Sequence, residues 1–244
     1  MDGLIPKGRA TAVDSTGHRP DDGDQSPIPY VFPPWVNQIP KIIPIAAAAF
    51  GVVVVFIVWF WFSPQHTEVG YAPKQPVAYS HKLHVGQYGI DCLYCHTSVD
   101  KGPHANVPPT ETCMNCHTVV KYDSPLLEKV RQSFRDGTPI EWTRVHALPD
   151  FAFFSHAQHV AKGVGCVECH GRVDQMDVVR VDQPLSMSWC LDCHRNPGPH
   201  LRPREEVTNM AWTVPEGQDP IAYGNQLVEQ YHVAAPVDCS GCHR

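Results

Sequence analysis

Charged residues are scarce in this sequence, and basic residues are not in excess. Only 18% of the 244 residues are Asp, Glu, Lys or Arg, and the formal net charge at pH 7 is −6. Nucleic-acid-binding proteins need a basic surface, so this balance argues against nucleic acid and favours a basic or neutral partner. The sequence also lacks a convincing hairpin or sheet pattern, while its 24 prolines and 17 glycines indicate a chain of loops and short helices.

No cysteine lies outside five copies of the motif Cys-x-x-Cys-His. In this motif the two thiols attach a c-type haem covalently, and the adjoining histidine binds its iron from one side. The predicted attachment residues are Cys92, Cys95, Cys113, Cys116, Cys166, Cys169, Cys190, Cys193, Cys239 and Cys242. The predicted proximal iron ligands are His96, His117, His170, His194 and His243. The sequence therefore predicts five c-type haems, whose apolar faces would supply the core that a loop-rich chain lacks.

Three other uses of paired cysteines fit the pattern less well. A zinc ribbon does not need a histidine directly after every second cysteine. A redox dithiol needs only one pair, placed beside a βαβ pattern that this sequence does not show. A disulfide framework does not confine every cysteine to a tight pair. Haem attachment accounts for all ten cysteines and for the five adjoining histidines.

A pair of histidines repeats together with the haem motifs. The pattern aromatic-Ser-His-x-x-His at residues 79–84 returns 75 positions later at residues 154–159. The spacing between motifs alternates short and long, which indicates two two-haem repeats and a fifth haem that begins a third repeat. In each pair, one histidine would serve the haem that follows and the other would reach a neighbouring haem. The predicted distal iron ligands are His81, His84, His156 and His159.

The fifth distal ligand stays open between four side chains. His232 lies seven residues before the fifth motif, in the same place as His159 before the third. His146 is a second candidate. Met187 and Met176, which flank the fourth motif, offer a thioether, and a His/Met haem has a higher reduction potential than a His/His haem. Methionines among apolar neighbours more often only pack, so the sequence does not decide between the four.

One long hydrophobic run lies near the N-terminus. Residues 42–62 contain no charged side chain and are long enough to cross a membrane as a helix. Pro44 falls in the first turn of this predicted helix, where a missing N–H costs little. A cleaved signal peptide is the competing interpretation. It is less favoured because its small residues should follow the bulky stretch, whereas the alanines at 46–49 precede it.

The hydrophobic run divides the chain into four predicted parts. Residues 1–41 form a cytoplasmic tail, in which 27–40 are extended with aromatic side chains near the membrane surface. Residues 42–62 are the transmembrane helix, 63–78 a linker, and 79–244 a pentahaem domain. Bacteria attach c-type haem outside the cytoplasmic membrane. We therefore expect a single-pass protein of the inner membrane with its haem domain on the periplasmic side.

Two further helices are predicted in the long gaps between haem motifs. Ser124 and a following proline start an amphipathic segment that Gly137 ends. Asp219 and Pro220 start another segment, which runs to Tyr231.

These features together resemble the pentahaem cytochrome c subunit of bacterial alternative complex III. The likeness rests on the single span, the five motifs, the histidine pairs and the stretch Met187-Ser-Trp-Cys-Leu-Asp-Cys-His-Arg195, and it covers about residues 30–244. It implies a multihaem cytochrome c fold with class III or c7-like repeats, in which loops and short α-helices pack around five haems. It also implies mostly His/His haems with one His/Met haem, which favours the methionines above.

The resemblance also implies a function in electron transfer. This chain would be a subunit of a quinol-oxidising respiratory or photosynthetic membrane complex that includes an iron–sulfur subunit. Electrons would pass through the haems to a soluble periplasmic carrier or a terminal oxidase, and we expect no bond-making chemistry and no catalytic residue on this chain.

Two alternatives belong to other classes of protein. A free-standing membrane-anchored quinol dehydrogenase needs its own quinol pocket, for which Glu68 is the acidic residue near the outer end of the span. A multihaem reductase needs an iron with an open coordination position, yet the chain has enough spare histidines and methionines to fill all five.

Overall fold

The computed structural model describes residues 31–243, so the prediction for residues 1–30 lies outside the described part. The chain separates into two compact units, Met1–Val55 and Phe56–Arg244. Between residues 31 and 243 the elements are helices and turns without a β-strand, and one isolated β-bridge pairs Val164 with Leu201. The prediction of loops and short helices is confirmed.

Sixteen helical segments follow one another within residues 31–243. The α-helices are α1 Ile39–Trp61, α2 Pro64–Thr67, α3 Cys92–Cys95, α4 Thr110–His117, α5 Glu128–Asp136, α6 His156–Ala161, α7 Cys166–His170, α8 Met187–Arg195, α9 Pro220–Gln230 and α10 Cys239–Cys242. Five 3₁₀ helices are η1 Pro34–Gln38, η3 Pro125–Leu127, η4 Val173–Gln175, η5 Gly198–His200 and η6 Arg204–Glu206. The remaining segment, η2 Lys82–Gln87, is a π-helix.

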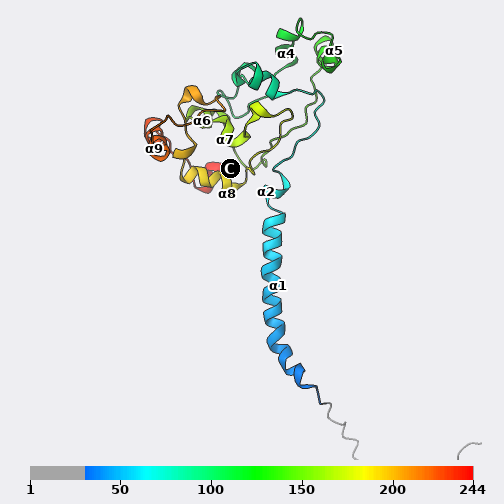
Figure 1. Cartoon of the computed structure of the whole chain (residues 1–244), viewed down its shortest axis with the longest axis vertical. Coiled ribbons are helices and arrows are strands. Elements are labelled where there is room, and N and C mark those ends of the chain that lie inside the picture. The colour runs from blue at the N-terminus through cyan, green and yellow to red at the C-terminus, as the bar shows by residue number, and fades with distance from the viewer. Residues whose placement is uncertain (1–30, 244) are drawn as a thin grey trace, which may run out of the picture. The chain divides into compact units, whose positions relative to one another are not determined.

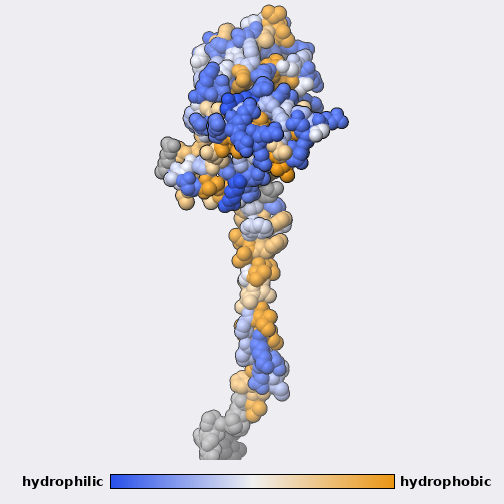
Figure 2. Space-filling model, turned by 90° about the vertical axis from the view of Figure 1, so that its left-hand side faces the viewer, coloured by the Kyte–Doolittle hydropathy of each residue, from blue (hydrophilic) through white to orange (hydrophobic). Residues whose placement is uncertain are grey.

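Helix α1 is long and apolar. Together with η1 it gives a 28-residue helical segment with a mean hydropathy of 2.7 and no buried residue. This length and composition are enough to cross a membrane, and a signal sequence near the N-terminus would share them. Figure 2 shows hydrophobic residues along most of this helix and a hydrophilic group near its N-terminal end, whereas the surface of the second unit is mainly hydrophilic in the same view.

The helix begins earlier than the sequence predicted. Residues 34–38 form η1 and α1 begins at Ile39, so the extended conformation expected for 27–40 is wrong over 34–40. Pro44 lies inside α1 and not in its first turn. The reason is that Pro34 and Pro40 occupy the early positions where a missing N–H is tolerated. Pro44 then leaves the carbonyl of Pro40 without its usual helical partner.

The second unit is built from short helices joined by loops (Figure 1). In this view α4 and α5 lie at one end, α6 and α7 in the middle, and α8 beside the C-terminus at the other end. Helix α4 packs on α5, and α9 packs on η5. The two predicted helices are confirmed. Gly137 ends α5 in the left-handed conformation at φ 64°, and the side chain of Asp219 caps α9 by accepting from the N–H of Ala222.

Among the described residues of this unit, side chains alone build only two small apolar clusters. The first contains Val77, Met114 and Val130, and the second contains Leu201, Leu227 and Tyr231. No large side chain among the described residues is completely buried. This agrees with the expectation that the polypeptide does not supply the whole core by itself.

The segment 63–78, predicted as a linker, packs on the rest of the second unit. Val77 is 8% exposed and belongs to the first cluster. The N–H of Gly70 donates to the carbonyl of Val181 at 2.8 Å, and the N–H of Val181 donates to the carbonyl of Tyr71 at 3.0 Å. These contacts hold the segment after α1 against the loop that follows η4.

Truncation of Leu227 tests the second cluster. Leu227 is 5% exposed, whereas Ile221 on the same helix is 61% exposed. We expect Leu227→Ala to lower the free energy of unfolding by about 2–4 kcal/mol, because it leaves a cavity. The matched variant Ile221→Ala should change it by less than about 0.5 kcal/mol. Denaturant unfolding followed by far-UV circular dichroism measures both, and equal effects would contradict the assignment of this cluster as core.

Candidate haem centres

Each Cys-x-x-Cys-His motif lies on a short helix that ends at or near its histidine. The motifs occupy α3, the end of α4, α7, the second half of α8, and α10 with the residue after it. Three of these helices have a side-chain cap: Asp91 accepts from Leu93, Ser186 from Trp189, and Asp238 from Gly241. One helical turn places residues three apart on the same face, so both thiols of a motif face one side.

Burial raises the pKa values of several of the ten cysteine thiols. No disulfide joins them. Burial raises the pKa of Cys92 and of Cys193 to about 11, and that of Cys169 to about 12. Redox-active dithiols have lowered pKa values, so these sites do not fit that class. Within residues 31–243 no group of three or more His, Cys, Asp or Glu side chains is placed to hold a metal ion.

Three proximal histidines face a histidine of the repeated pairs. The ring centres are 6.2 Å apart for His84 and His117 and 6.1 Å for His159 and His194. Those of His156 and His170 are 6.3 Å apart, with the rings almost parallel at 8°. Metal–imidazole bonds are about 2 Å long, which places the ring centres of two opposed ligands about 6 Å apart. The donor set and its spacing fit the axial coordination of one iron between each pair.

The ring nitrogens of these histidines are oriented by the main chain. Among the proximal set, the Nδ1 atoms of His96, His117, His194 and His243 lie 2.7–3.0 Å from the carbonyls of Asn106, Val120, Pro236 and Phe151 respectively. Among the distal candidates, the Nδ1 atoms of His84, His156 and His159 lie 2.8–2.9 Å from the carbonyls of Ser80, Pro103 and Ser155. A carbonyl only accepts, so each Nδ1 must carry the proton. This leaves Nε2 as the free base that binds a metal.

The first motif has His81 as its neighbour. Nδ1 of His81 is buried and has no hydrogen-bond partner. Burial, together with the charges of His96 and His84, lowers its pKa to about 4. Burial likewise lowers the pKa of His170 to about 3. Both imidazoles are therefore neutral at pH 7, which is the form that binds iron.

One aromatic side chain packs on both histidines of each pair. Tyr79 lies 4.8 Å from His81 and 4.4 Å from His84, measured between ring centres. Phe154 lies 4.7 Å from His156 and 4.6 Å from His159. In both copies the first contact is edge-on and the second is closer to parallel. The repeat seen in the sequence is thus also a repeat of side-chain packing, although η2 is a π-helix and α6 an α-helix.

The structure does not bring the four candidates for the fifth distal ligand together at His243. His232 is exposed, with φ 49°, at the end of α9. His146 lies beside His170, 4.5 Å between ring centres, and its buried Nε2 has no partner. Met176 is 3% exposed and its carbonyl accepts from Lys82, next to the first histidine pair. Met187 is 68% exposed at the start of α8. Phe151 is the ring that contacts His243, 5.8 Å between centres.

Sequence reasoning missed an ionic cluster beside the third motif. Glu168, between the two cysteines, accepts from Nη2 of Arg202 at 2.7 Å and from Nδ1 of His200 at 3.0 Å. Arg202 is 4% exposed and its guanidinium also stacks over Trp212 at 5.2 Å. A glutamate inside a motif is the only sequence signal, because its two partners are more than thirty positions away. The cluster holds α7 against the segment 200–212.

The hydrogen bond to Glu168 makes the contribution of His200 to the stability of the folded chain depend on pH. It raises the pKa of His200 above its ordinary value. The stability that the protonated His200 imidazole contributes to the folded chain is fully present below about pH 6.5. It is lost as the pH rises through the raised pKa. We therefore expect His200→Asn to destabilise the protein more at acidic than at alkaline pH, by less than about 1 kcal/mol because the pair is partly exposed.

Urea unfolding of both proteins on either side of this range measures the difference. The matched variant His104→Asn replaces an exposed histidine and should show no such dependence on pH. The same loss of stability for His200→Asn at both pH values would contradict the ion pair.

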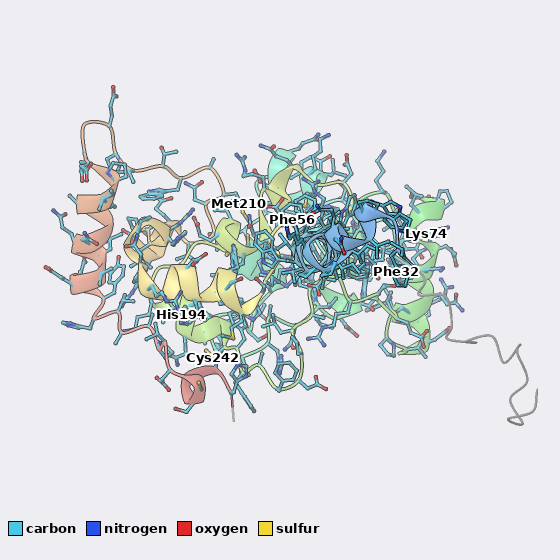
Figure 3. All side chains as sticks on the ribbon, turned by 90° about the horizontal axis from the view of Figure 1, so that it is seen from below. Phe32, Phe56, Lys74, His194, Met210 and Cys242 are labelled. Atoms are coloured by element: carbon cyan, nitrogen blue, oxygen red, sulfur yellow. The ribbon has the colours of Figure 1, made fainter. Side chains whose placement is uncertain are left out.

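Figure 3 labels His194 and Cys242, which lie near one another in the view from below; α8 and the C-terminus are also close in Figure 1. The fourth and fifth motifs are therefore neighbours in space as well as in sequence.

Comparison with known proteins places the chain among multihaem cytochromes. Residues 152–244, which contain the last three motifs, match the family described as cytochrome c7 and related cytochrome c. The chain is 35% identical, over 170 aligned residues, to the menaquinone reductase multiheme cytochrome c subunit of Nitratidesulfovibrio vulgaris. The alignment covers 60% of this chain and 79% of that protein. The chain therefore belongs to the family of multihaem c-type cytochromes that includes this subunit.

Proposed function

We propose that this chain is the electron-transfer subunit of a quinone-linked membrane complex of the alternative complex III kind. The observation that carries the proposal is the set of three histidine pairs with ring centres 6.1–6.3 Å apart, each containing the histidine of a Cys-x-x-Cys-His motif. The relative in Nitratidesulfovibrio vulgaris is named as a subunit of a menaquinone reductase. That name supports a quinone-linked complex for this chain too.

The proposed cofactors are five c-type haems, which supply reversible one-electron chemistry when bound. The ten cysteines would hold them covalently. His117, His170 and His194 would bind iron on the proximal side, opposite His84, His156 and His159 respectively. His96 would pair with His81, by analogy with the third motif and its first upstream histidine. His243 is the fifth proximal ligand, and its opposite ligand comes from the set His146, His232, Met176 and Met187.

The residues of the chain would do three things. The cysteine motifs fix the groups in place, the main-chain carbonyls fix the tautomers of most axial histidines, and burial lowers the pKa values of His81, His159 and His170 and so favours their neutral form. Electrons would pass from an iron–sulfur subunit to a soluble periplasmic carrier or a terminal oxidase. The apolar segment 42–62 would anchor the chain in the bacterial inner membrane, with residues 1–41 cytoplasmic and 79–244 periplasmic.

A second candidate function is quinol oxidation on this chain itself. A cavity of about 310 Å³ is lined by Glu68, Tyr71, Arg144 and His146 among others, and Glu68 lies shortly after the end of α1 in the sequence. His146 in turn contacts His170 of the third motif. A carboxylate and an imidazole could accept the protons that a quinol releases.

Menaquinol titration of the purified complex and of the isolated full chain separates the two candidates. We expect mild detergent to extract the chain together with an integral quinone-binding subunit and an iron–sulfur subunit. Menaquinol should reduce the haems of the complex and leave those of the isolated chain oxidised. Reduction of the isolated chain at the same rate would support the second candidate. A chain that purifies alone from fresh membranes and is not reduced by menaquinol would contradict both.

A further inference from the structure

The contacts between the five motifs are not those expected if the motifs followed one another in sequence order. The first link joins the second motif to the first. Asn115 lies between the cysteines of the second motif, and its Nδ2 donates to the hydroxyl of Tyr94, between the cysteines of the first, at 3.1 Å. His84, whose ring faces His117, lies one helical turn from His81.

The second link joins the first motif to the third, through two adjacent residues. Sγ of Cys92 lies 3.9 Å from the carbonyl oxygen of Thr208, and the carbonyl of Val207 accepts from the N–H of Cys166 at 3.1 Å. The hydroxyl of Thr208 also donates to Asp91 at 2.8 Å. The first cysteine of the first motif and the first cysteine of the third motif thus contact the same short segment, residues 207–208.

The same link has a second, independent support. The loop that follows the first motif carries Pro103, whose carbonyl accepts from Nδ1 of His156 at 2.8 Å. The carbonyl of Gly102 accepts from the N–H of Ala157 at 3.1 Å. Helix α6, which carries the histidine that faces the third motif, therefore rests on the loop of the first motif.

The third link joins the third motif to the fourth. His156 and His159 lie on one turn of α6, and their rings face His170 and His194 respectively. The fourth link joins the fourth motif to the fifth. Nδ1 of His194 donates to the carbonyl of Pro236 at 2.7 Å. Pro236 packs so tightly on Gly241, inside the fifth motif, that a β-carbon at Gly241 would lie 2.5 Å from its Cβ.

The second motif makes no comparable contact with the third, fourth or fifth motif within residues 31–243, among the hydrogen bonds and ring contacts of these residues. Figure 1 agrees, since α4 lies at one end of the unit, α7 in the middle and α8 with the C-terminus at the other end.

We infer that the five haem-attachment sites form one line in the spatial order second, first, third, fourth, fifth. The inference rests on the proposed haem content and goes beyond it, because it identifies the two ends. The sites of His117 and His243 exchange electrons with partners outside the chain, and the sites of His96, His170 and His194 relay them. Next to these ends, Val119 is 83% exposed and Phe151 is 65% exposed, so both ends reach the surface of this chain.

Iron positions in the haem-loaded full chain test this order directly, by anomalous scattering from crystals. We expect the iron beside His117 at one end, with the iron beside His96 as its nearest neighbour, and the iron beside His170 next along the line. An iron beside His96 at an end of the line, or one beside His117 nearest to that of His170, would overturn the order. Neither outcome depends on quinol, so the result is independent of whether the proposed function holds.

A matched pair of variants gives a second test by electron paramagnetic resonance. Removing a terminal haem with Cys113→Ala and Cys116→Ala should alter the signal of one remaining haem, that of the first site. Removing a central haem with Cys166→Ala and Cys169→Ala should alter the signals of two. If loss of the second-site haem alters two signals, the second site is not an end and the inference is wrong.

Discussion

His159→Met is expected to raise the midpoint potential of one haem while the others keep theirs. His159 faces His194 at 6.1 Å between ring centres, and its Nδ1 is held by the carbonyl of Ser155. A thioether in place of an imidazole favours the reduced iron. Axial ligands span a range of about 0.8 V across haem proteins, so we expect a rise on the order of 0.1 V. A spectroelectrochemical titration of the full chain measures it.

The control for this variant is His104→Met, which places the same side chain at an exposed histidine outside the set of candidate iron ligands. It should leave all five midpoint potentials unchanged. If the two variants give the same titration curve as the unaltered chain, His159 is not an axial ligand. If only the control variant shifts a potential, the assignment of His159 is wrong.

Cys190→Ala combined with Cys193→Ala is expected to remove one haem of the five. Burial raises the pKa values of both thiols, so neither serves as a reactive thiolate. Without them the fourth motif cannot attach its haem, and we expect four haems per chain by the haemochrome assay. The stability should also fall by several kcal/mol, on the order of the loss of a large buried side chain, because the haem would fill space that the small apolar clusters leave to it.

Leu191→Ala is the matched control, since Leu191 lies between the two cysteines on α8 and bears no thiol. It should retain all five haems. An unchanged haem content in the double cysteine variant would show that the fourth motif does not attach haem.

The sequence predicted the local elements well where short-range chemistry decides them. The proline and glycine around residues 125–137 and the cap at Asp219 act within a few positions, and the structure confirms both helices. The predicted start of the membrane-spanning helix was wrong. Three prolines lie close together there, and the sequence does not show which of them precedes the helix and which falls inside it. The histidine pairs were also found from the sequence, because each pair lies within one turn.

The pairing between distant residues could not be predicted from the sequence. Which ring faces His117 or His194 depends on how the loops fold, and the carbonyls that orient these rings come from residues such as Pro236, forty-two positions from His194. The link through Val207 and Thr208 is likewise long-range. The position of Glu168 inside a motif was not enough to predict the ionic cluster, because its partners His200 and Arg202 reach it only in the folded chain. The fifth distal ligand stays a prediction among four side chains.

The most direct test of the whole account is the intact mass of the full chain after denaturation, when only covalently attached groups remain. Thioether attachment at five motifs predicts the polypeptide mass plus five haems, with all ten thiols unavailable to alkylation. The bare polypeptide mass, or a mass with fewer than five haems together with free thiols, would contradict the account.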